Sequence, residues 1–404
     1  MRVLCISSWF PWPPDNGARI RTYNLLKAMG STHDLYLVSL LQPESRREDA
    51  ASLADFCHVV SMHESRWFDP NTWRSFVGLF SSQPRSIVDT YQPTVKTAVA
   101  DAIAQVRPDV LVVSPLSAAA YIPDGVGIPM VLDEHDCEYA RLQRSSATAR
   151  GLRKARLELS WRKCARWEAQ LCRLFAAIAV SGEVERQRLL RAAPDLAQLI
   201  VVPSGVDTDH YSAEGRRPGP GRLVYNGALT YGVNLQAVRY FASQVYPILQ
   251  RTHTDAKLMV TGRTKGVDLT GLDDCPGVGF TGYVDDIRDV LRQSAVCVVP
   301  LLEGGATRLK VLEAMGAGVP IVSTSMGAEG IDAVDGTHLL IADTPAEFAA
   351  AVGRVLTDEA LARSLSKNAR RFVEQQYSWS GIGPEFTRIV ESAAQCAPNC
   401  EAKQ

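Results

Sequence analysis

Short apolar runs of strand length alternate with longer amphipathic stretches along most of the chain. The runs lie at residues 3–8, 35–41, 58–62, 110–114, 130–133, 176–180, 199–202, 223–225, 257–261, 296–301 and 320–323. Helical periodicity follows several of them, at residues 19–29, 95–106, 140–175, 234–250, 345–356 and 359–374. Strands that are apolar throughout and alternate with helices are typical of a parallel sheet covered on both faces. The pattern therefore predicts an α/β protein.

Residues 211–222, with the sequence YSAEGRRPGPGR, interrupt this alternation. They are rich in Gly, Pro and Arg and have no hydrophobic period, which is typical of a linker. A chain of 404 residues that is 46% apolar can bury two sizeable cores. We therefore expect one domain over residues 1–210 and a second over residues 211–377.

A glycine loop and a helix connect the strand runs 296–301 and 320–323. The loop leaves the backbone bare at Gly304, Gly305 and Ala306. Thr307 is a suitable N-cap, and the helix that follows has an apolar stripe of Leu309, Leu312 and Met315. Because backbone N–H groups and the helix dipole converge at such a point, the loop is a candidate anion site.

Two cations in the first turn of this helix support the anion site. Arg308 and Lys310 would be disfavoured by the positive end of the helix dipole unless an anion lies nearby. The alternative is an ordinary crossover helix with solvated charges, in which Lys310 and Glu313 form a pair three residues apart. Spacing alone leaves both interpretations open.

The segment from GGATRLK through Glu313-Ala314-Met315 to Gly318-Val319-Pro320 resembles the sugar-nucleotide signature of the group-1 retaining glycosyltransferases, family 4. It is most similar to a branch with a GG(G/A)TRLK-type donor loop. The resemblance implies that Glu313 binds the ribose hydroxyls of the donor. It also assigns donor contacts to Gly304, Gly305, Ala306, Thr307 and Leu309, and charge stabilisation to Arg308 and Lys310. Gly305 stands where the family usually carries a further glutamate.

His135 follows the strand run 130–133, at the edge of the sheet where open parallel sheets bind ligands. The stretch VLDEHDCEYAR resembles the family segment whose histidine contacts the donor sugar, which implies a catalytic role for His135. The alternative is a structural histidine. A metal held by the four residues 134–137 is disfavoured, because alternate residues of an extended segment point in opposite directions.

Other candidate donor contacts follow strand runs. The loop at Asp15, Asn16 and Gly17, followed by Arg19, closes over the donor diphosphate or the acceptor, or else is a bare turn with a solvated arginine. Arg263 follows the run 257–261 and is placed to reach a phosphate. The residues 277–282 match GxGxxG, but without a preceding strand and an opening helix they do not indicate a dinucleotide site. The adjoining turn, with Tyr283, resembles the family turn that meets the nucleobase.

The predicted helix over residues 140–175 is strongly basic. Ten Arg and Lys side chains, at positions 141, 144, 150, 153, 154, 156, 162, 163, 166 and 173, interleave with Leu and Trp. Such a helix can associate peripherally with an anionic membrane near a lipid-linked acceptor. The alternative is a long helix at the edge of a cleft with a solvated face.

Charge and cysteine content narrow the choice of partner and compartment. A formal net charge of −1 gives no reason to expect nucleic acid as a partner. Nine cysteines without paired spacing favour reduced thiols and a cytoplasmic location, with the inner face of the membrane as the peripheral alternative. The N-terminus does not have the pattern of a signal peptide, and no apolar run reaches membrane-spanning length. We expect no metal, because Asp207 and Asp209 belong to a predicted inter-domain turn, and no cofactor.

Together, the pattern and the resemblance imply a GT-B fold, in which two doubly wound, Rossmann-like domains face one another across a cleft. The C-terminal segment 378–404 is expected to cross back onto the first domain. The implied reaction is retaining, metal-independent transfer of a sugar from a nucleotide-sugar donor to a sugar, lipid-linked or small-molecule acceptor, in glycan, glycolipid or natural-product biosynthesis. Two alternatives stay open, a nucleotide-sugar 2-epimerase and a non-catalytic nucleotide-sugar-binding scaffold. The sequence names neither nucleobase, sugar, acceptor nor oligomeric state.

Overall fold

The computed structural model describes residues 1–43, 45–303 and 308–395. The chain divides into two compact units, the first made of Met1–Pro203 with Ile382–Gln404 and the second of Ser204–Gly381. The linker pattern predicted the boundary at residue 210, and the family resemblance predicted that the returning segment starts at residue 378. Each unit has its own parallel sheet and its own buried core.

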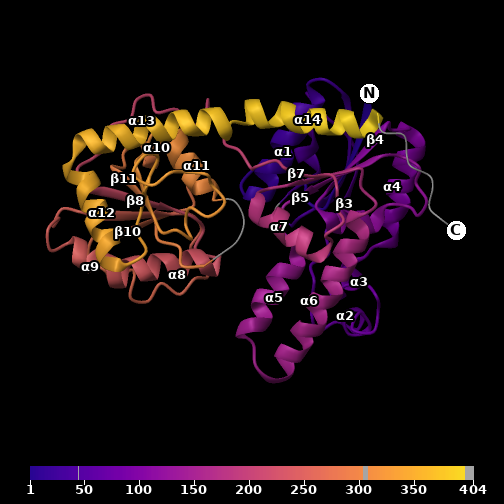
Figure 1. The fold of residues 1–404 in the computed structure, drawn as a ribbon, viewed down its shortest axis with the longest axis horizontal. Helices are drawn as coiled ribbons and strands as arrows, with labels where there is room; N and C mark the ends of the chain where they lie inside the picture. The colour runs from indigo at the N-terminus through magenta and orange to yellow at the C-terminus, as the bar shows by residue number, and fades with distance from the viewer. Residues whose placement is uncertain (44, 304–307, 396–404) are drawn as a thin grey trace. The chain divides into compact units, whose positions relative to one another are not determined.

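The described part of the first unit contains a seven-stranded parallel sheet in the order β3-β2-β1-β4-β5-β6-β7 (Figure 1). Its strands are β1 (Arg2–Ser7), β2 (Asp34–Leu41), β3 (His58–Glu64), β4 (Val110–Ser114), β5 (Met130–Glu134), β6 (Ala177–Val180) and β7 (Leu199–Val201). The central strands β4, β5 and β6 are buried along their whole length, as their apolar runs predicted. Because β1 lies between β2 and β4, the chain reverses direction across the sheet there, and a ligand crevice is expected at the carboxyl ends of β1 and β4.

The helices of this unit, among the residues that the structure describes, follow its strands along the chain. They are α1 (Gly17–Gly30), η1 (Arg47–Leu53), α2 (Trp73–Val77), α3 (Arg85–Thr90), α4 (Pro93–Val106), η2 (Leu116–Tyr121), α5 (Glu138–Thr148), α6 (Gly151–Cys172) and α7 (Glu183–Ala192). Asn16 accepts a hydrogen bond from the N–H of Arg19 and so caps α1. Gly182 holds the N-cap of α7, while the hydroxyl of Ser181 donates to the carbonyl of His135.

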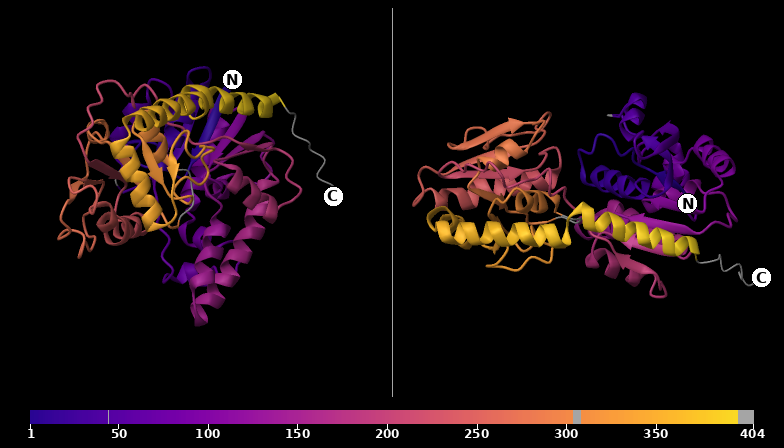
Figure 2. Two further views of the ribbon diagram at one scale, coloured as in Figure 1. Left: turned by 60° about the vertical axis from the view of Figure 1, so that its left-hand side comes forward. Right: turned by 90° about the horizontal axis from the view of Figure 1, so that it is seen from above.

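The basic stretch 140–175 is a helical hairpin and not the single long helix that we predicted. The chain breaks between α5 and α6, where Arg150 is extended and Gly151 has a φ of 57°. A left-handed backbone is readily adopted by glycine and interrupts a helix. Figures 1 and 2 show the hairpin projecting away from the sheet of its unit, and we call these two helices the arm.

The described part of the second unit contains a six-stranded parallel sheet in the order β10-β9-β8-β11-β12-β13. Its strands are β8 (Arg222–Asn226), β9 (Lys257–Thr261), β10 (Val278–Gly282), β11 (Val296–Val299), β12 (Ile321–Ser323) and β13 (Leu340–Ile341). The helices are α8 (Gly232–Tyr240), a π turn η3 (Phe241–Val245), α9 (Tyr246–Leu249), α10 (Arg288–Arg292), α11 (Leu309–Gly316), α12 (Pro345–Thr357) and α13 (Glu359–Gln376). Because β8 lies between β9 and β11, the switch point of this sheet is at the carboxyl end of β8.

The predicted crossover between two parallel strands is present as β11-α11-β12. Leu312 and Met315 are fully buried, which confirms the apolar stripe of its helix. Residues Gly304, Gly305, Ala306 and Thr307 lie outside the described residues. The helix begins at Leu309 with Arg308 at the N-cap, one position after the N-cap we predicted.

Helix α14 (Trp379–Gln395) begins in the second unit and continues into the first. Trp379, its first residue, is buried. In the first unit, Phe386 and Val390 of α14 are buried, and His33 Nε2 lies 3.0 Å from Glu391 Oε1. Among the helices that the structure describes, none combines the length and apolar content needed to cross a bilayer.

Candidate functional site

The carboxyl edge of the second sheet holds an oriented carboxylate. Glu313 of α11 accepts a hydrogen bond of 2.7 Å from the side-chain amide of Asn226 at the end of β8, and the phenol of Tyr211 also hydrogen-bonds to it. Thr261, at the end of β9, donates to Asn226 Oδ1 over 3.1 Å and thereby fixes the orientation of the amide. Burial raises the pKa of Glu313, and Tyr211, Lys310 and Asn226 offset only part of that rise.

The ammonium of Lys310 lies one turn before Glu313 on the same helix. It sits 4.2 Å from the centroid of the Tyr225 ring and donates over 2.8 Å to both Tyr225 Oη and Asn234 Oδ1. Burial lowers the pKa of Lys310 to about 7, because the charged form loses hydration there. Tyr225 and Asn234 therefore hold the amino group of Lys310 in place before any ligand binds, and the interpretation as a solvated surface charge is wrong.

Two glycines bring the backbone of the second unit close to this lysine. A Cβ at Gly227 would lie 2.7 Å from Lys310 Nζ and 2.9 Å from Asn234 Nδ2, so a side chain there would displace the ammonium from its present position. Gly262 has a φ of 116°, and a Cβ there would lie 2.6 Å from the carbonyl carbon of Gly227. The loops after β8 and β9 are thus in direct contact and expose little side chain at the switch point.

Three further predicted residues lie at the same edge of the second unit. The guanidinium of Arg263, in the loop after β9, lies 5.5 Å from the centroid of the exposed ring of Tyr283, in the turn after β10. Arg308 is buried, and its Nη2 donates to the carbonyl of Met326 over 3.4 Å. Burial lowers the pKa of Arg308.

The first unit holds a separate polar network around His135, directly after β5. His135 Nε2 lies 2.9 Å from Asp133 Oδ2 and 3.0 Å from Ser114 Oγ at the end of β4. Arg21 of α1 donates to Asp133 Oδ1 over 2.8 Å and to the carbonyl of Val202. Burial alone would raise the pKa of Asp133, but Arg21 and His135 outweigh it and the pKa is lowered. The aspartate is therefore ionised and holds the imidazole in one orientation.

Glu134, the residue before His135, has a different hydrogen-bonding partner. Glu134 is buried and accepts a hydrogen bond of 2.8 Å from the backbone N–H of Leu116.

Gly17 is the exposed first residue of α1. Arg19 is buried and pairs with Asp15 over 3.0 Å, so the interpretation of this loop as a turn with a solvated arginine is wrong.

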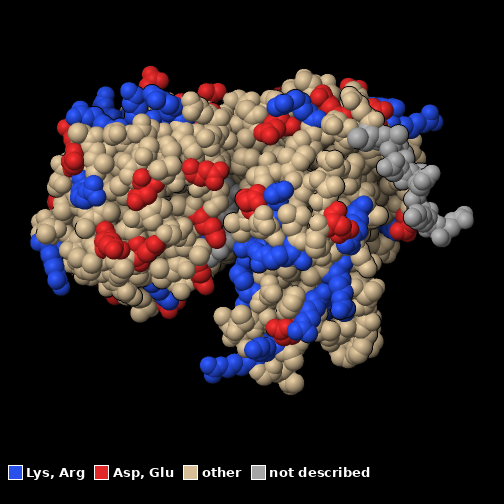
Figure 3. All heavy atoms as spheres, in the orientation of Figure 1, with Lys and Arg blue, Asp and Glu red and all other residues tan. Residues whose placement is uncertain are grey.

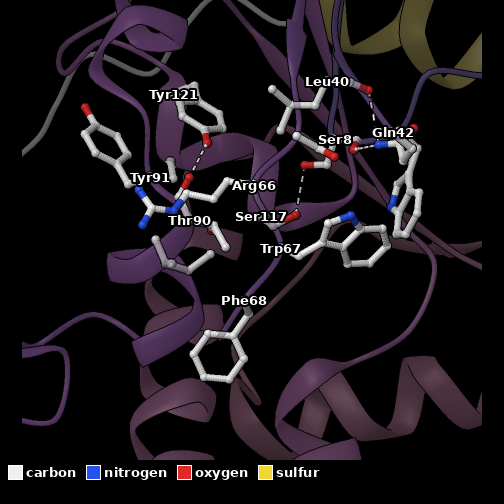
Figure 4. A pocket seen from close by; sticks show the side chains of 14 residues that line it. Ser8, Leu40, Gln42, Arg66, Trp67, Phe68, Thr90, Tyr91, Ser117 and Tyr121 are labelled. Carbon is white, nitrogen blue, oxygen red and sulfur yellow. Dashed lines mark hydrogen bonds between the residues drawn. The ribbon is translucent and has the colours of Figure 1, made fainter. Parts of the chain in front are cut away.

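A pocket of about 170 Å³ opens at the carboxyl edge of β1, β2 and β4 in the first unit (Figure 4). Figure 4 shows Ser8, Ser117 and Trp67 at one end of it and Tyr91 and Tyr121 at the other. Trp9 and Trp67 meet edge to face at 6.3 Å, while Tyr91 and Tyr121 stack at 5.6 Å. The remaining lining residues include Gln42, Arg66 and Phe68. Aromatic walls with a few hydroxyl and amide groups suit a polar, ring-shaped ligand.

The predicted site residues therefore fall into two groups. The first unit contains Gly17 and His135. The second unit contains Arg263, Tyr283, Arg308, Leu309, Lys310 and Glu313. Sequence reasoning missed the partners of these residues, namely Ser114, Asp133, Arg21, Tyr211, Tyr225, Asn226 and Asn234. For Ser114, Asp133 and Asn226 a signal existed, because each is a polar residue at the carboxyl end of an apolar run.

Within the described residues, no group of three or more His, Cys, Asp or Glu side chains is arranged to hold a metal ion. Asp207, one of the two aspartates of the predicted inter-domain turn, has a local structural use. Its Oδ1 accepts hydrogen bonds from the backbone N–H groups of Asp209 and His210.

Two family models match the chain. The model described as Glycosyltransferase Family 4 matches residues 15–210, and the model described as Glycosyl transferases group 1 matches residues 220–358. The first match covers His135 and the lining residues of the aromatic pocket from Leu40 onward, but not Ser8 and Trp9. The second match covers Arg263, Lys310 and Glu313.

Curated relatives match about half of the chain. The glycogen synthase of Mycobacterium tuberculosis is 28% identical over 213 residues, which are 50% of this chain and 50% of that protein. The phosphatidyl-myo-inositol mannosyltransferase of Mycobacterium leprae is 26% identical over 234 residues, which are 55% of this chain and 60% of that protein. The chain thus spans about half the length of the curated relatives it matches.

Solved structures share the fold over nearly the whole chain. The Anabaena protein HepE, crystallised with UDP and glucose, matches with a TM-score of 0.68 at 14% identity, over 97% of this chain and 99% of that chain. At this identity the likeness shows the fold, which is GT-B. By its fold and its two family models, the chain belongs to the GT-B glycosyltransferases of the family 4 type.

Proposed function

We propose that this protein transfers a sugar from a nucleotide-diphosphate donor to an acceptor hydroxyl, with retention of anomeric configuration and without a metal ion. The observation that carries the proposal is the pair of Lys310 and Glu313 on α11. They place a partly buried ammonium and a hydrogen-bonded carboxylate one helical turn apart at the switch point of the second sheet. A nucleoside diphosphate needs both, an anion receptor for the phosphates and an acceptor for the ribose hydroxyls.

In this proposal the donor binds to the second unit. Glu313 accepts both ribose hydroxyls, and Asn226 and Tyr211 hold the carboxylate in place for them. Tyr283 lies beside the nucleobase, and Arg263, which stacks on its ring, reaches the diphosphate. Gly227 and Gly262 leave the backbone bare so that the phosphates approach Lys310 closely.

The transfer step follows from front-face departure of the leaving group. The bond between the sugar C1 and the diphosphate oxygen breaks, and the acceptor oxygen bonds to C1 from the same face. The acceptor proton passes to the departing phosphate oxygen. Negative charge grows on that phosphate, and Lys310 and Arg308 stabilise it because they are held in place before the reaction begins. His135 contacts the transferred sugar, and Asp133 and Ser114 set its orientation.

We assign the acceptor to the aromatic pocket of the first unit. Trp9 and Trp67 offer apolar faces to a sugar ring, and Gln42, Ser8 and Ser117 offer hydrogen-bonding groups. A lipid-linked acceptor is consistent with the mannosyltransferase relative, whose name describes a phosphatidylinositol substrate.

The test begins with calorimetric titration of UDP, GDP and dTDP sugars, followed by NMR of the products. With water as the acceptor, an α-linked donor should release the α-sugar first, and EDTA should leave the rate unchanged. Release of the β-sugar would overturn retention, and loss of turnover with EDTA would overturn metal independence.

The same assay separates the alternatives. Conversion of the donor to its 2-epimer would indicate the epimerase, and tight binding without any consumption of donor would indicate a binding scaffold. The family models both describe glycosyltransferases and therefore favour transfer.

A further inference from the structure

We propose that the first unit carries a docking surface for anionic phospholipid bilayers, formed by the arm together with three exposed aromatic side chains of a neighbouring segment. This surface is separate from the groups assigned to donor, sugar and acceptor. The inference does not depend on the proposed transfer reaction, because binding to vesicles is measured without any nucleotide sugar.

The aromatic side chains are Trp73 and Phe76 of α2 and Phe80 directly after it, which we call the aromatic ridge. Their exposed fractions are 74%, 49% and 80%. The rings of Trp73 and Phe76 stack at 5.6 Å, and Phe76 and Phe80 meet edge to face at 5.7 Å. Large aromatic side chains normally bury most of their surface, so a contiguous exposed cluster marks a surface that contacts another apolar phase.

The ridge is attached directly to the basic arm. Lys163 of α6 donates hydrogen bonds of 2.9 Å to the carbonyls of Gly78 and Leu79, in the segment between Phe76 and Phe80. Arg85 of α3 donates to the carbonyl of Ser75 and lies close enough to Arg156 of α6 for their charges to repel. The ridge and the arm therefore form one continuous surface of the first unit.

This surface is positive and apolar at once. Between residues 138 and 173 the chain has ten Arg and Lys against three Glu, and Figure 3 shows Lys and Arg gathered over the hairpin. Leu152, beside the turn of the hairpin, is 92% exposed, and Leu159 of α6 is also exposed. Cations that attract anionic headgroups, beside Trp, Phe and Leu that enter the boundary with the acyl chains, are the composition of an interfacial membrane anchor.

A nucleic acid is the other polyanion that such residues can attract, but the geometry favours a bilayer. Trp73 and Phe76 stack face to face on each other, so each has one face fewer on which a base could stack. The exposed aliphatic side chains Leu152, Leu159 and Val77 suit acyl chains and offer nothing to a base edge. The chain as a whole is also not basic, with a net charge of −1.

The experiment is co-sedimentation of the full chain with vesicles of phosphatidylcholine alone and of an equal mixture of phosphatidylcholine and phosphatidylglycerol. We expect binding to the mixed vesicles and little to the neutral ones. The charge variant is Arg150→Gln with Arg153→Gln and Lys154→Gln, all exposed on the arm. Because each surface cation contributes about fivefold to partition onto an anionic membrane, the variant should bind about 100-fold more weakly. The matched control, Arg363→Gln with Lys367→Gln and Arg371→Gln on α13, should bind like the wild type.

The aromatic variant is Trp73→Ser with Phe76→Ser and Phe80→Ser, with Val334→Ser, exposed in the second unit, as its control. We expect the aromatic variant to bind the mixed vesicles at least about 10-fold more weakly than the wild type does. This difference should persist in about 1 M salt, because salt screens the electrostatic attraction and leaves the apolar contribution. Trp73→Phe keeps an apolar ring and should bind nearly as the wild type does.

Several results would overturn the inference. One is equal binding of the charge variant and its α13 control. Another is binding to a single-stranded oligonucleotide that is tighter than binding to the mixed vesicles. A third is concentration-dependent self-association through the ridge, seen in light scattering as a dimer that the aromatic variant loses while vesicle binding stays unchanged.

Discussion

At the scale of single residues, the candidate site depends on ionisable groups held in unusual surroundings. Lys310 packs against the Tyr225 ring and shares Asn234 with its hydroxyl, while Glu313 is held by Asn226 and Tyr211. Burial disfavours the charged form of each group, so both gain when a ligand supplies the missing partner. We therefore expect substitutions at these residues to change nucleotide binding and turnover.

Glu313→Ala should weaken binding of the preferred nucleoside diphosphate by roughly 30-fold, because it removes charge-assisted bonds of about 2 kcal/mol to the ribose. Calorimetry on the wild type and the variant measures the loss. The control is the 2′,3′-dideoxy form of the same nucleotide, which should bind both proteins equally. If the variant also loses affinity for the dideoxy nucleotide by the same factor, Glu313 does not bind the ribose.

Lys310 should make donor binding depend on pH. Its pKa of about 7 lies below that of an ordinary lysine, so the ammonium that binds the diphosphate is progressively lost above pH 7. The dissociation constant should be flat below pH 7 and rise about tenfold per pH unit above it. The folding stability of the free protein should change with pH in the opposite direction to the donor affinity. The free protein should gain stability as pH rises from 7, because its folded state binds fewer protons than the unfolded state there.

Titration calorimetry from pH 6 to pH 9 checks the binding slope, with a nucleotide sugar whose diester phosphates stay ionised throughout. Lys310→Met should bind weakly with little pH dependence. The control is Lys257→Met. Lys257 is the first residue of β9, at the end of the strand away from Thr261 and the candidate site, so this variant should keep the wild-type slope. A wild-type slope in Lys310→Met would return this lysine to a structural role.

His135→Ala should reduce kcat at least about 10-fold while the affinity for nucleoside diphosphate stays unchanged, because the residue belongs to the first unit and the nucleotide is assigned to the second. Ser114→Ala removes one of the two hydrogen-bonding partners of His135 Nε2 and should give a smaller loss in kcat. In the double variant the two losses should not add, since Ser114 acts through His135. Additive losses would show that Ser114 has a role of its own.

At the scale of elements, the loops at the carboxyl edge of the second sheet define the space for the phosphates. The loop after β8 passes so close to the loop after β9 that Gly262 would collide with it if it carried a side chain. In the first unit, the extended backbone at Ala149 and Arg150 and the left-handed backbone at Gly151 divide the single helix that we predicted into the two helices of the arm.

Gly262→Ala should destabilise the second unit by about 2 to 4 kcal/mol, from the strained φ and from the contact with Gly227. Chemical denaturation followed by far-UV circular dichroism measures the loss. Gly266→Ala is the matched control. Gly266 also has a positive φ, of 79°, but a Cβ there would meet nothing within 4 Å, so only about 1 kcal/mol should be lost. Equal losses in the two variants would rule out the close approach of the two loops.

At the scale of the whole molecule, the two units are linked by one helix as well as by the chain between them. Helix α14 starts with Trp379 in the second unit, and its remainder packs in the first. A Cβ at Gly383 would lie 2.5 Å from the Cβ of Ala28, which shows how closely α14 approaches α1. The C-terminal helix is therefore part of the core of the first unit.

Phe386→Ala should lower the stability of the first unit by about 3 to 5 kcal/mol, because it removes a fully buried ring. We expect the unfolding transition of the first unit to move to lower temperature, while the melting shift produced by a nucleoside diphosphate in the second unit stays the same. Arg388→Ala, exposed on the same helix, is the control and should change neither quantity. Loss of the nucleotide shift in Phe386→Ala would mean that the two units unfold as one.

The sequence by itself determined the class of fold and the bounds of several elements. Apolar runs and caps depend on residues only a few positions apart, so β4 and β9 were predicted to the residue, and the order Arg308, Lys310, Glu313 was readable as a donor signature. The arm was missed as a hairpin because its basic, weakly periodic sequence continues through the turn. Its helices are separated only by the extended backbone at Ala149 and Arg150 and the left-handed backbone at Gly151.

Only the tertiary structure decided which groups surround those residues. Asn226 and Glu313 are 87 positions apart, and Arg21 and Asp133 are 112 apart. Such pairs depend on strand order and on how helices pack over the sheet, which no local pattern specifies. The same holds for the aromatic ridge. Trp73, Phe76 and Phe80 have the composition of core residues. Their place beside a basic hairpin depends on contacts between Lys163 of α6 and the carbonyls of Gly78 and Leu79, which are more than 80 positions away in the sequence.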